Sequence, residues 1–94
     1  MSSPCVVAPE MHFLPGTVIK WDSENCCYWV VNPATDIAVG KIWVDSDFNV
    51  PVYYLYRVYR EHDFMLDDFV YYDGSLMYYG QDWVTAQRWA LELI

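Results

Sequence analysis

The sequence predicts an α+β fold, in which one antiparallel, strongly twisted sheet of five to six strands carries a single C-terminal helix packed on one face. Segments rich in Tyr, Trp and Val alternate with polar turns over residues 17–80, a pattern typical of strands. The last segment has apolar residues at helical spacing instead. No Pro-, Gly- or Ser-rich stretch divides the 94 residues, so one domain over residues 1–94 is expected.

An extended N-terminal arm is expected to precede the strands. Pro4, Pro9 and Pro15 interrupt both kinds of periodicity within residues 1–16. Gly40 interrupts the third expected strand and indicates a bulge or a close packing contact. The sheet is assigned to residues 17–80, with strands at residues 17–21, 26–31, 37–44, 50–60, 64–72 and 75–79.

The clearest turn signal in the chain is Asp73-Gly74, which lies between two aromatic segments. Both residue types tolerate the positive φ angles of a type I′ turn, the usual two-residue connection of a hairpin. Residues 64–72 and 75–79 are therefore predicted to pair with each other as the best-defined hairpin of the sheet.

The closing helix is predicted over residues 82–94. Asp82 can cap its first turn by accepting hydrogen bonds from free backbone N–H groups. Such a helix is about 20 Å long and about 10 to 12 Å thick, whereas five to six strands make a sheet about 24 to 29 Å wide. The helix is therefore too small to cover one face. Its apolar stripe consists of Trp83, Ala86, Trp89, Ala90, Leu93 and Ile94.

The strands are apolar on both faces, which strands show when they lie between two covering layers. In residues 50–60 the two sets are Tyr54, Tyr56 and Val58 on one face, and Tyr53, Leu55, Arg57 and Tyr59 on the other. The second face is expected to be covered by curling of the sheet into a half-barrel, by self-association as a homodimer, or by another protein. Tyr and Trp are enriched at protein interfaces.

The chain is acidic, since thirteen Asp and Glu oppose five Lys and Arg and the formal net charge is −8 at pH 7. The basic residues are scattered, which disfavours direct nucleic-acid binding because neutralising phosphates requires a clustered positive surface. A protein partner with a basic or nucleic-acid-binding surface is favoured instead.

The sequence suggests no catalytic residue, no metal site and no cofactor. Asp45 and Asp47 match the first positions of a calcium loop, but Val50 stands where the loop requires glycine. His12 and His62 lack the ligand spacing of a zinc site. The isolated glycines form no phosphate-binding loop. A small enzyme or ligand binder with a tyrosine-lined pocket near His62 remains an alternative.

Cysteine usage and hydropathy favour a reduced protein in the cytoplasm. Cys26 and Cys27 are adjacent, which ordinary disulfide geometry does not join, and Cys5 makes the count odd. The longest apolar runs, such as residues 52–56, fall far short of the roughly 20 residues that span a bilayer. No membrane association and no signal peptide are expected.

The candidate partner-binding surface combines acidic turns with aromatic side chains. Rows of carboxylates beside tyrosines can imitate the phosphates of a nucleic acid and occupy a basic channel. The simpler alternative is that the carboxylates provide solubility. The predicted residues are Tyr53, Leu55, Arg57, Tyr59, Glu61, Asp63, Asp67, Asp68, Asp45 and Asp47.

The order of the segments resembles a known group of proteins. Trp29-Val30-Val31 precedes Asn32-Pro33, and Tyr79-Gly80 leads into Asp82 and a short helix. From Lys20 onward this architecture, with its size and acidity, is similar to small accessory proteins of bacteriophages and prophages, anti-CRISPR proteins among them. The resemblance implies a non-enzymatic inhibitor that binds a CRISPR-Cas type defence complex in the host cytoplasm, and it carries over no functional residue.

Overall fold

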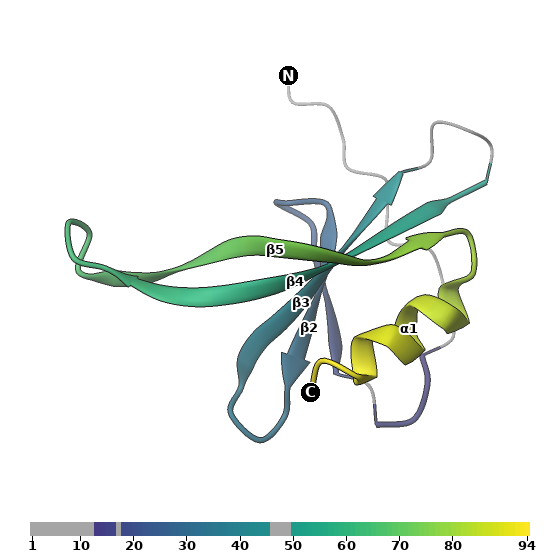
Figure 1. Cartoon of the computed structure of the whole chain (residues 1–94), viewed down its shortest axis with the longest axis horizontal. Helices are drawn as coiled ribbons and strands as arrows, with labels where there is room; N and C mark the ends of the chain where they lie inside the picture. The colour runs from purple at the N-terminus through teal and green to yellow at the C-terminus, as the bar shows by residue number, and fades with distance from the viewer. Residues whose placement is uncertain (1–12, 17, 46–49) are drawn as a thin grey trace.

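The computed structural model describes residues 13–16, 18–45 and 50–94. These residues form one antiparallel sheet in the order β1-β2-β3-β4-β5, so every strand pairs with its neighbours in the sequence (Figure 1). The α+β prediction with one C-terminal helix is confirmed. The elements are β1 (Ile19–Asp22), β2 (Cys27–Asn32), β3 (Ile37–Asp45), β4 (Val52–Asp63), β5 (Asp68–Gly80) and α1 (Trp83–Leu91).

The sheet is not closed, because no pairing joins β1 to β5 among the described residues. The sheet is therefore open at both edges, and its curling into a half-barrel stays a prediction. Most of the expected N-terminal arm, together with Thr17 and Asp47, lies outside the described residues.

The core lies between one face of the sheet and α1. A row of cross-strand partners crosses this face from β1 to β5: Trp21, Tyr28, Ile42, Leu55 and Tyr78. The three members on β2, β3 and β4 are at most 1% exposed. Because side chains alternate along a strand, the pairing register gives all three strands the same apolar set on the helix side.

Helix α1 packs on this row through small side chains. Ala86 and Ala90 are fully buried, and alanine lets the helix backbone approach the sheet closely. The Trp83 ring lies 5.2 Å from the ring centroids of both Tyr28 and Tyr53. Helix α1 therefore packs on one face of the sheet, chiefly over β4 and β5. Among the described residues no other helix packs on the opposite face (Figure 1).

The predicted N-terminal cap of α1 is confirmed. Asp82 Oδ1 accepts from the Val84 backbone N–H at 3.1 Å, and Asp82 Oδ2 accepts from Thr85 Oγ1 at 2.6 Å. The hydrogen bond from Thr85 is the main reason that the pKa of Asp82 lies below its usual value. These bonds satisfy donors that would otherwise have no partner within the helix.

Gly40 shows the close packing that the sequence predicts. A Cβ atom at this position would lie 2.8 Å from Cδ1 of Leu93, which follows α1. The pairing register between β2 and β3 also shifts next to it, between Val30 and Val31. A side chain at this position would require the Leu93 side chain to move.

The predicted turn at Asp73-Gly74 is wrong. Strand β5 runs through both residues, and the hairpin turns between Asp63 and Asp68 instead. The pairing register between β4 and β5 shifts here. Gly74 is needed because the ring of Tyr59 packs against its backbone and would collide with a Cβ atom. In a strand, glycine also marks a bulge or a close approach, which is its role at this site.

The cysteines differ from the predicted reduced state. Cys27 is a buried free thiol, and burial raises its pKa to about 11. Cys26 is disulfide-bonded, and it lies in the turn before β2 with a φ angle of 55°. The prediction placed Cys26 inside a strand as a small apolar residue, whereas the turn brings it toward the surface.

Candidate functional site

The most prominent feature of the surface is a projecting hairpin. Strand β3 pairs with β4 only as far as Arg57, whereas β4 pairs with β5 as far as Asp63 and Asp68. Among the described residues, residues 58–73 therefore pair only with one another, and they are called the β4–β5 arm. With about 3.3 Å per residue, its strands extend about 20 Å. Figure 1 shows it reaching away from α1 and from the other strands.

Three large apolar side chains occupy the end of the β4–β5 arm. Phe64, Met65 and Leu66 are 88%, 96% and 67% exposed, and they are called the apolar tip. Single exposed apolar residues are common, but contiguous ones mark interaction sites more often. The apolar tip lies at the outermost point of a projection, where a concave partner surface can enclose it.

Hydrogen bonds within the turn hold the apolar tip in place. Asp63 Oδ1 accepts from the backbone N–H groups of Met65 at 2.9 Å and Leu66 at 3.3 Å. Asp67 completes the turn with a φ angle of 51°. An aspartate that bonds the backbone two residues on stabilises such turns. The tip is therefore ordered before any partner binds, which lowers the entropy cost of docking.

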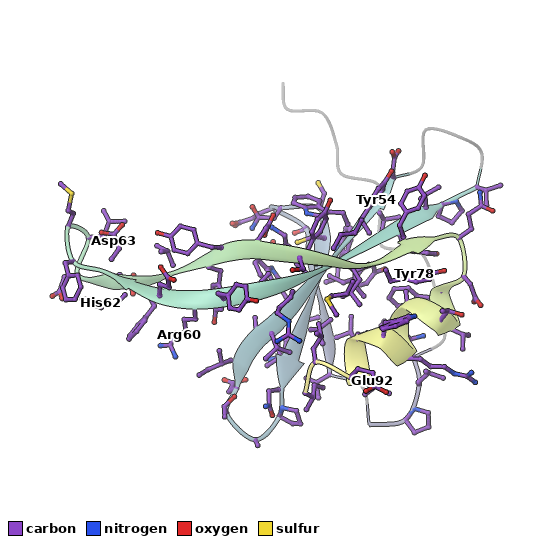
Figure 2. All side chains as sticks on the ribbon, viewed as in Figure 1. Tyr54, Arg60, His62, Asp63, Tyr78 and Glu92 are labelled. Carbon is purple, nitrogen blue, oxygen red and sulfur yellow. The ribbon has the colours of Figure 1, made fainter. Side chains whose placement is uncertain are left out.

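The acidic run that the sequence singled out surrounds the apolar tip. Asp63 and Asp68 are cross-strand partners at the end of the β4–β5 arm, Asp67 lies in the turn, and Glu61 pairs with Val70. Figure 2 shows His62 and Asp63 together at this far end. The structure thus brings four of the predicted residues to one place, as an acidic border around an apolar centre.

Aromatic and cationic side chains line one face of the β4–β5 arm. The Arg60 guanidinium lies 3.8 Å from the centroid of the Phe69 ring. The His62 ring packs edge-on against Phe64 at 4.7 Å and Phe69 at 5.3 Å, and its Nε2 lies 3.4 Å from Asp67 Oδ1. A two-stranded hairpin is marginally stable alone, so these contacts support its projection.

The other predicted partner-binding residues are dispersed. Tyr53 and Leu55 are 4% and 0% exposed in the core beneath α1, so they are not available to a partner. Arg57 and Asp45 are half-buried, and Tyr59 is 48% exposed where it packs against Gly74. The alternation in β4 gave two apolar sets, and the predicted set turns out to be the one that faces the helix.

The face opposite α1, called the uncovered face, is partly closed by its own side chains. Lys41 Nζ lies 2.5 Å from Asp73 Oδ1. The same ammonium group lies 5.5 Å and 4.8 Å from the ring centroids of Trp29 and Trp43. Tyr71 of the β4–β5 arm packs against Trp29 with the ring centroids 5.6 Å apart. These contacts remove apolar area from water without a second layer.

Asp22 fixes the orientation of Trp29 on the uncovered face. Its Oδ2 accepts from Trp29 Nε1 at 2.9 Å and from Asn25 Nδ2 at 2.6 Å. The hydrogen bond from the Asn25 side chain, followed by that from Trp29, lowers the pKa of Asp22 to about 2. The carboxylate therefore stays ionised at neutral pH and holds the indole ring in one position.

Within residues 13–16, 18–45 and 50–94, no group of three or more His, Cys, Asp or Glu side chains is placed to hold a metal ion. No helix in these ranges combines the length and the apolar character needed to cross a bilayer. His62 lies on the projecting β4–β5 arm among Phe64, Phe69 and Asp67.

The sequence reasoning missed the apolar tip. Residues 64–66 were assigned to a strand because Asp73-Gly74 supplied a stronger turn signal. The available sign was Asp63, whose side chain can bond the two following backbone N–H groups, followed by Asp67 and Asp68. Comparison with protein-family models, curated proteins and solved structures finds no match for this chain.

Proposed function

We propose that this chain is a non-enzymatic protein-binding inhibitor, which docks its β4–β5 arm into a basic, nucleic-acid-binding site of a partner protein. The observation that carries the proposal is the end of the β4–β5 arm, where the exposed apolar tip is bordered by Glu61, Asp63, Asp67 and Asp68. This combination is suited to a concave partner site that is apolar inside and basic at its border.

The two parts of this surface contribute differently to binding. Burying a large apolar side chain contributes about 1.5 to 3 kcal/mol, so the apolar tip supplies affinity once it is enclosed. The carboxylates and the net charge of −8 increase the rate of encounter with a basic surface and select against acidic partners. A site that normally binds nucleic acid has the required positive charge.

The proposed target is a CRISPR-Cas type defence complex, and the supporting observations are the acidity, the small size and the architecture noted in the sequence. Inhibition follows because a protein that occupies the nucleic-acid channel excludes the target strand. The proposed place of action is the host cytoplasm, where disulfides are kept reduced. The proposal therefore requires that inhibition does not depend on the Cys26 disulfide, and inhibition is expected to be the same with and without a reducing agent.

The proposal is tested with a panel of purified CRISPR-Cas effector complexes, by measuring the binding of target DNA in a gel-shift titration. The wild-type protein is expected to abolish DNA binding by one of these complexes near a one-to-one ratio. The double variant Asp67→Lys with Asp68→Lys is expected to lose this effect, because it reverses the charge beside the apolar tip.

The matched control is Glu24→Lys with Glu92→Lys, which changes the net charge equally at exposed positions away from the β4–β5 arm. Retained inhibition in the control and loss in the arm variant support the proposal. Equal inhibition by the two variants would remove the electrostatic role of the β4–β5 arm. Unimpaired DNA binding by every complex in the presence of the wild-type protein would remove the proposed target class.

The outer edge of β5 favours homodimer formation as a second candidate. The thirteen residues of β5 pair on one side only among the described residues, and a long unpaired edge can pair with a second copy. The net charge of −8 opposes this association. Sedimentation equilibrium that shows only monomer at micromolar concentration would remove the candidate.

A further inference from the structure

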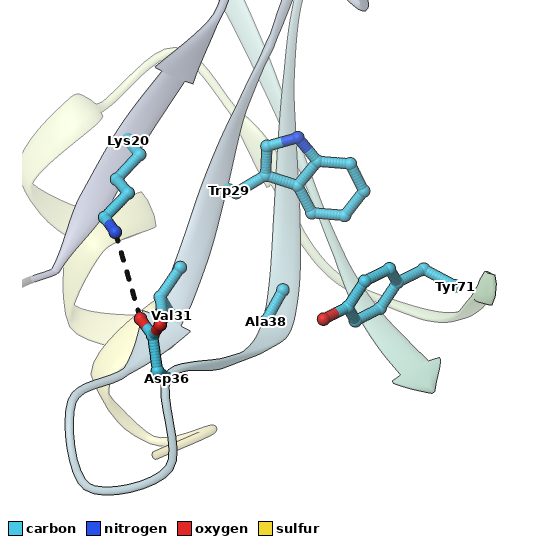
Figure 3. Close-up of a pocket in the computed structure, with 6 residues that line it drawn as sticks. All are labelled: Lys20, Trp29, Val31, Asp36, Ala38 and Tyr71. Atoms are coloured by element: carbon cyan, nitrogen blue, oxygen red, sulfur yellow. Dashed lines mark ion pairs between the residues drawn. The ribbon is translucent and has the colours of Figure 1, made fainter. Parts of the chain in front are cut away.

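A small pocket opens on the uncovered face at the base of the β4–β5 arm, separate from the apolar tip. Its volume is about 310 Å³, and Figure 3 shows the side chains around it. Strands β1, β2 and β3 contribute to it together with the β4–β5 arm and the turn before β3. The lining residues are Lys20, Trp29, Val31, Asp36, Ala38 and Tyr71.

The pocket has an apolar floor and an aromatic wall. Val31 and Ala38 are 7% and 9% exposed and lie in register on neighbouring strands. The rings of Trp29 and Tyr71 lie 5.6 Å apart at an angle of 49°. Because the Trp29 indole is held by its hydrogen bond to Asp22, this wall keeps its shape without a ligand.

An ion pair forms the opposite wall. Lys20 Nζ lies 3.9 Å from Asp36 Oδ1, and the two side chains are 64% and 88% exposed. Exposed pairs of this kind contribute little to stability, about 0 to 1 kcal/mol. Asp36 has a φ angle of 57°, and its backbone N–H donates to the Asn32 carbonyl at 2.7 Å. The backbone of Asp36 is thus held in place, whereas Lys20, the partner of its carboxylate, is easily displaced.

Cationic side chains of the chain itself lie over the faces of aromatic rings on this side of the molecule. Lys41 lies over Trp29 and Trp43, and Arg60 lies over Phe69. A cation is attracted by the electron-rich face of an aromatic ring, most strongly by tryptophan. The Trp29 and Tyr71 wall adds a carboxylate across an open space, which is the combination that recognises an organic cation.

We propose that this pocket takes the guanidinium group of an arginine side chain from a basic polypeptide. The planar guanidinium stacks on Trp29 and Tyr71, and its N–H groups donate to the Asp36 carboxylate in place of Lys20. Arginine fits better than lysine because its flat, weakly hydrated group stacks on rings and offers paired donors to a carboxylate.

The overall charge selects this ligand over an anion. Lys20 is the cation that an anionic ligand would use, but Asp36 stands beside it and the chain carries a net charge of −8. Acetylglutamate is therefore included in the test as the competing ligand. The proposal does not depend on a defence complex as partner or on docking of the apolar tip, so it stands or fails separately from the proposed function.

The test is an NMR titration of the wild-type protein, which follows the indole N–H signal of Trp29 and the backbone signals of Tyr71 and Asp36. The signal of Trp29 is assigned with Trp29→Phe. The probes are N-acetylarginine amide and N-acetylcitrulline amide, which have nearly the same shape but differ in charge. Arginine is expected to give saturable shifts at the pocket, with citrulline about two- to fivefold weaker or undetectable.

Two substitutions test the assigned roles in opposite directions. Asp36→Asn is expected to weaken arginine binding about two- to fivefold, and asparagine tolerates the left-handed backbone at this position. Lys20→Met is expected to strengthen arginine binding, because it removes the cation that competes for Asp36. The control is Glu24→Gln, which changes the net charge by the same amount as Asp36→Asn. Glu24 lies in the turn before β2, whereas Asp36 lies in the turn after it, so Glu24→Gln should leave arginine binding unchanged.

Equal binding of arginine and citrulline, or tighter binding of acetylglutamate than of arginine, would overturn the proposal. So would shifts of the indole signal of Trp83, the first residue of α1, that match those of Trp29, since binding would then be unspecific. An unchanged affinity in both Asp36→Asn and Lys20→Met would exclude the ion-pair wall from the site and overturn it as well.

Discussion

Tyr28 is the largest of the fully buried side chains among the described residues, and it carries a polar hydroxyl into the core. The residue is 1% exposed, its ring lies 4.8 Å from Trp21 and 5.2 Å from Trp83, and its hydroxyl has no hydrogen-bond partner among the described residues. Burial raises the pKa of this hydroxyl. The ring stabilises the core, whereas the hydroxyl is desolvated without a compensating bond.

Tyr28→Phe is therefore expected to leave the free energy of unfolding unchanged or to raise it by about 1 kcal/mol. Tyr28→Ala removes the ring and is expected to cost about 3 to 5 kcal/mol. Urea denaturation of the two variants measures both values. A loss of more than about 1 kcal/mol in Tyr28→Phe would show that the hydroxyl is hydrogen-bonded in solution.

Asp22 makes part of the stability depend on pH. Its pKa is about 2 in the folded protein, against an ordinary value of 3.8. A lowered folded-state pKa means that the stabilisation is complete above the unfolded value and is lost as the pH falls through the folded value. The contribution of Asp22 should thus be present at pH 5 and above, and should decline between about pH 4 and pH 2.

Asp22→Asn is expected to lower the free energy of unfolding at neutral pH. The difference in this free energy between wild type and variant should be smaller at pH 2, where the wild-type carboxylate becomes protonated. Thermal or urea unfolding across this pH range is the measurement, with Glu24→Gln as the control from the same turn. A difference that stays constant from pH 7 to pH 2 would show that the hydrogen bonds to Asn25 and Trp29 do not favour the ionised carboxylate.

At the scale of single elements, Gly74 shows how a local signal is overridden. Asp-Gly is a strong turn sequence, but alternation of side chains along β4 and β5 extends the pairing to Asp63 and Asp68. The ring of Tyr59 then packs against Gly74, an arrangement in which an aromatic side chain covers a strand glycine. Gly74 allows a contact between β4 and β5 that cannot be predicted from the residues next to it in the sequence.

Gly74→Ala is expected to cost about 1 to 3 kcal/mol, because the new methyl group collides with the Tyr59 ring. In a Tyr59→Ala background the cost of the same change should be smaller, because the ring contact is gone and the Arg57 carbonyl oxygen, 3.1 Å from the new Cβ atom, is the close contact that remains. A double-mutant cycle measures this coupling. Equal costs in the two backgrounds would place the turn, rather than the ring contact, at Gly74.

Features that are determined by residues close together in the sequence could be predicted, whereas features that depend on how the elements pack could not. The cap at Asp82 and the close packing at Gly40 follow from residue types at fixed spacing, and both are confirmed. The helix-facing set of β4 could not be chosen, because alternation defines two faces without naming the covered one. Tyr53 and Leu55 were therefore placed on the partner surface, although they lie in the core.

For the molecule as a whole, α1 is too small to cover the apolar side chains on both faces of the sheet, and two features of the structure deal with the rest. The uncovered face is partly closed by the Lys41 and Asp73 ion pair and by Trp29, Trp43 and Tyr71. Much of the remaining exposed apolar surface lies on the β4–β5 arm. The radius of gyration is 13.7 Å, above the roughly 12 Å of a compact domain of this length, because the arm projects.

The central claim is that the apolar tip of the β4–β5 arm docks into a basic, nucleic-acid-binding site. The most direct measurement compares inhibition of DNA binding by the triple variant Phe64→Ser, Met65→Ser and Leu66→Ser with that by a control, Val84→Ser with Trp89→Ser. The control removes exposed apolar side chains from α1 instead.

The target is the effector complex that the wild-type protein inhibits, and circular dichroism confirms that the variants are folded. The tip variant should need at least about tenfold more protein for half-inhibition, since three apolar side chains no longer fill the partner site. The control should match the wild type. A folded tip variant that inhibits as well as the wild type would contradict the claim.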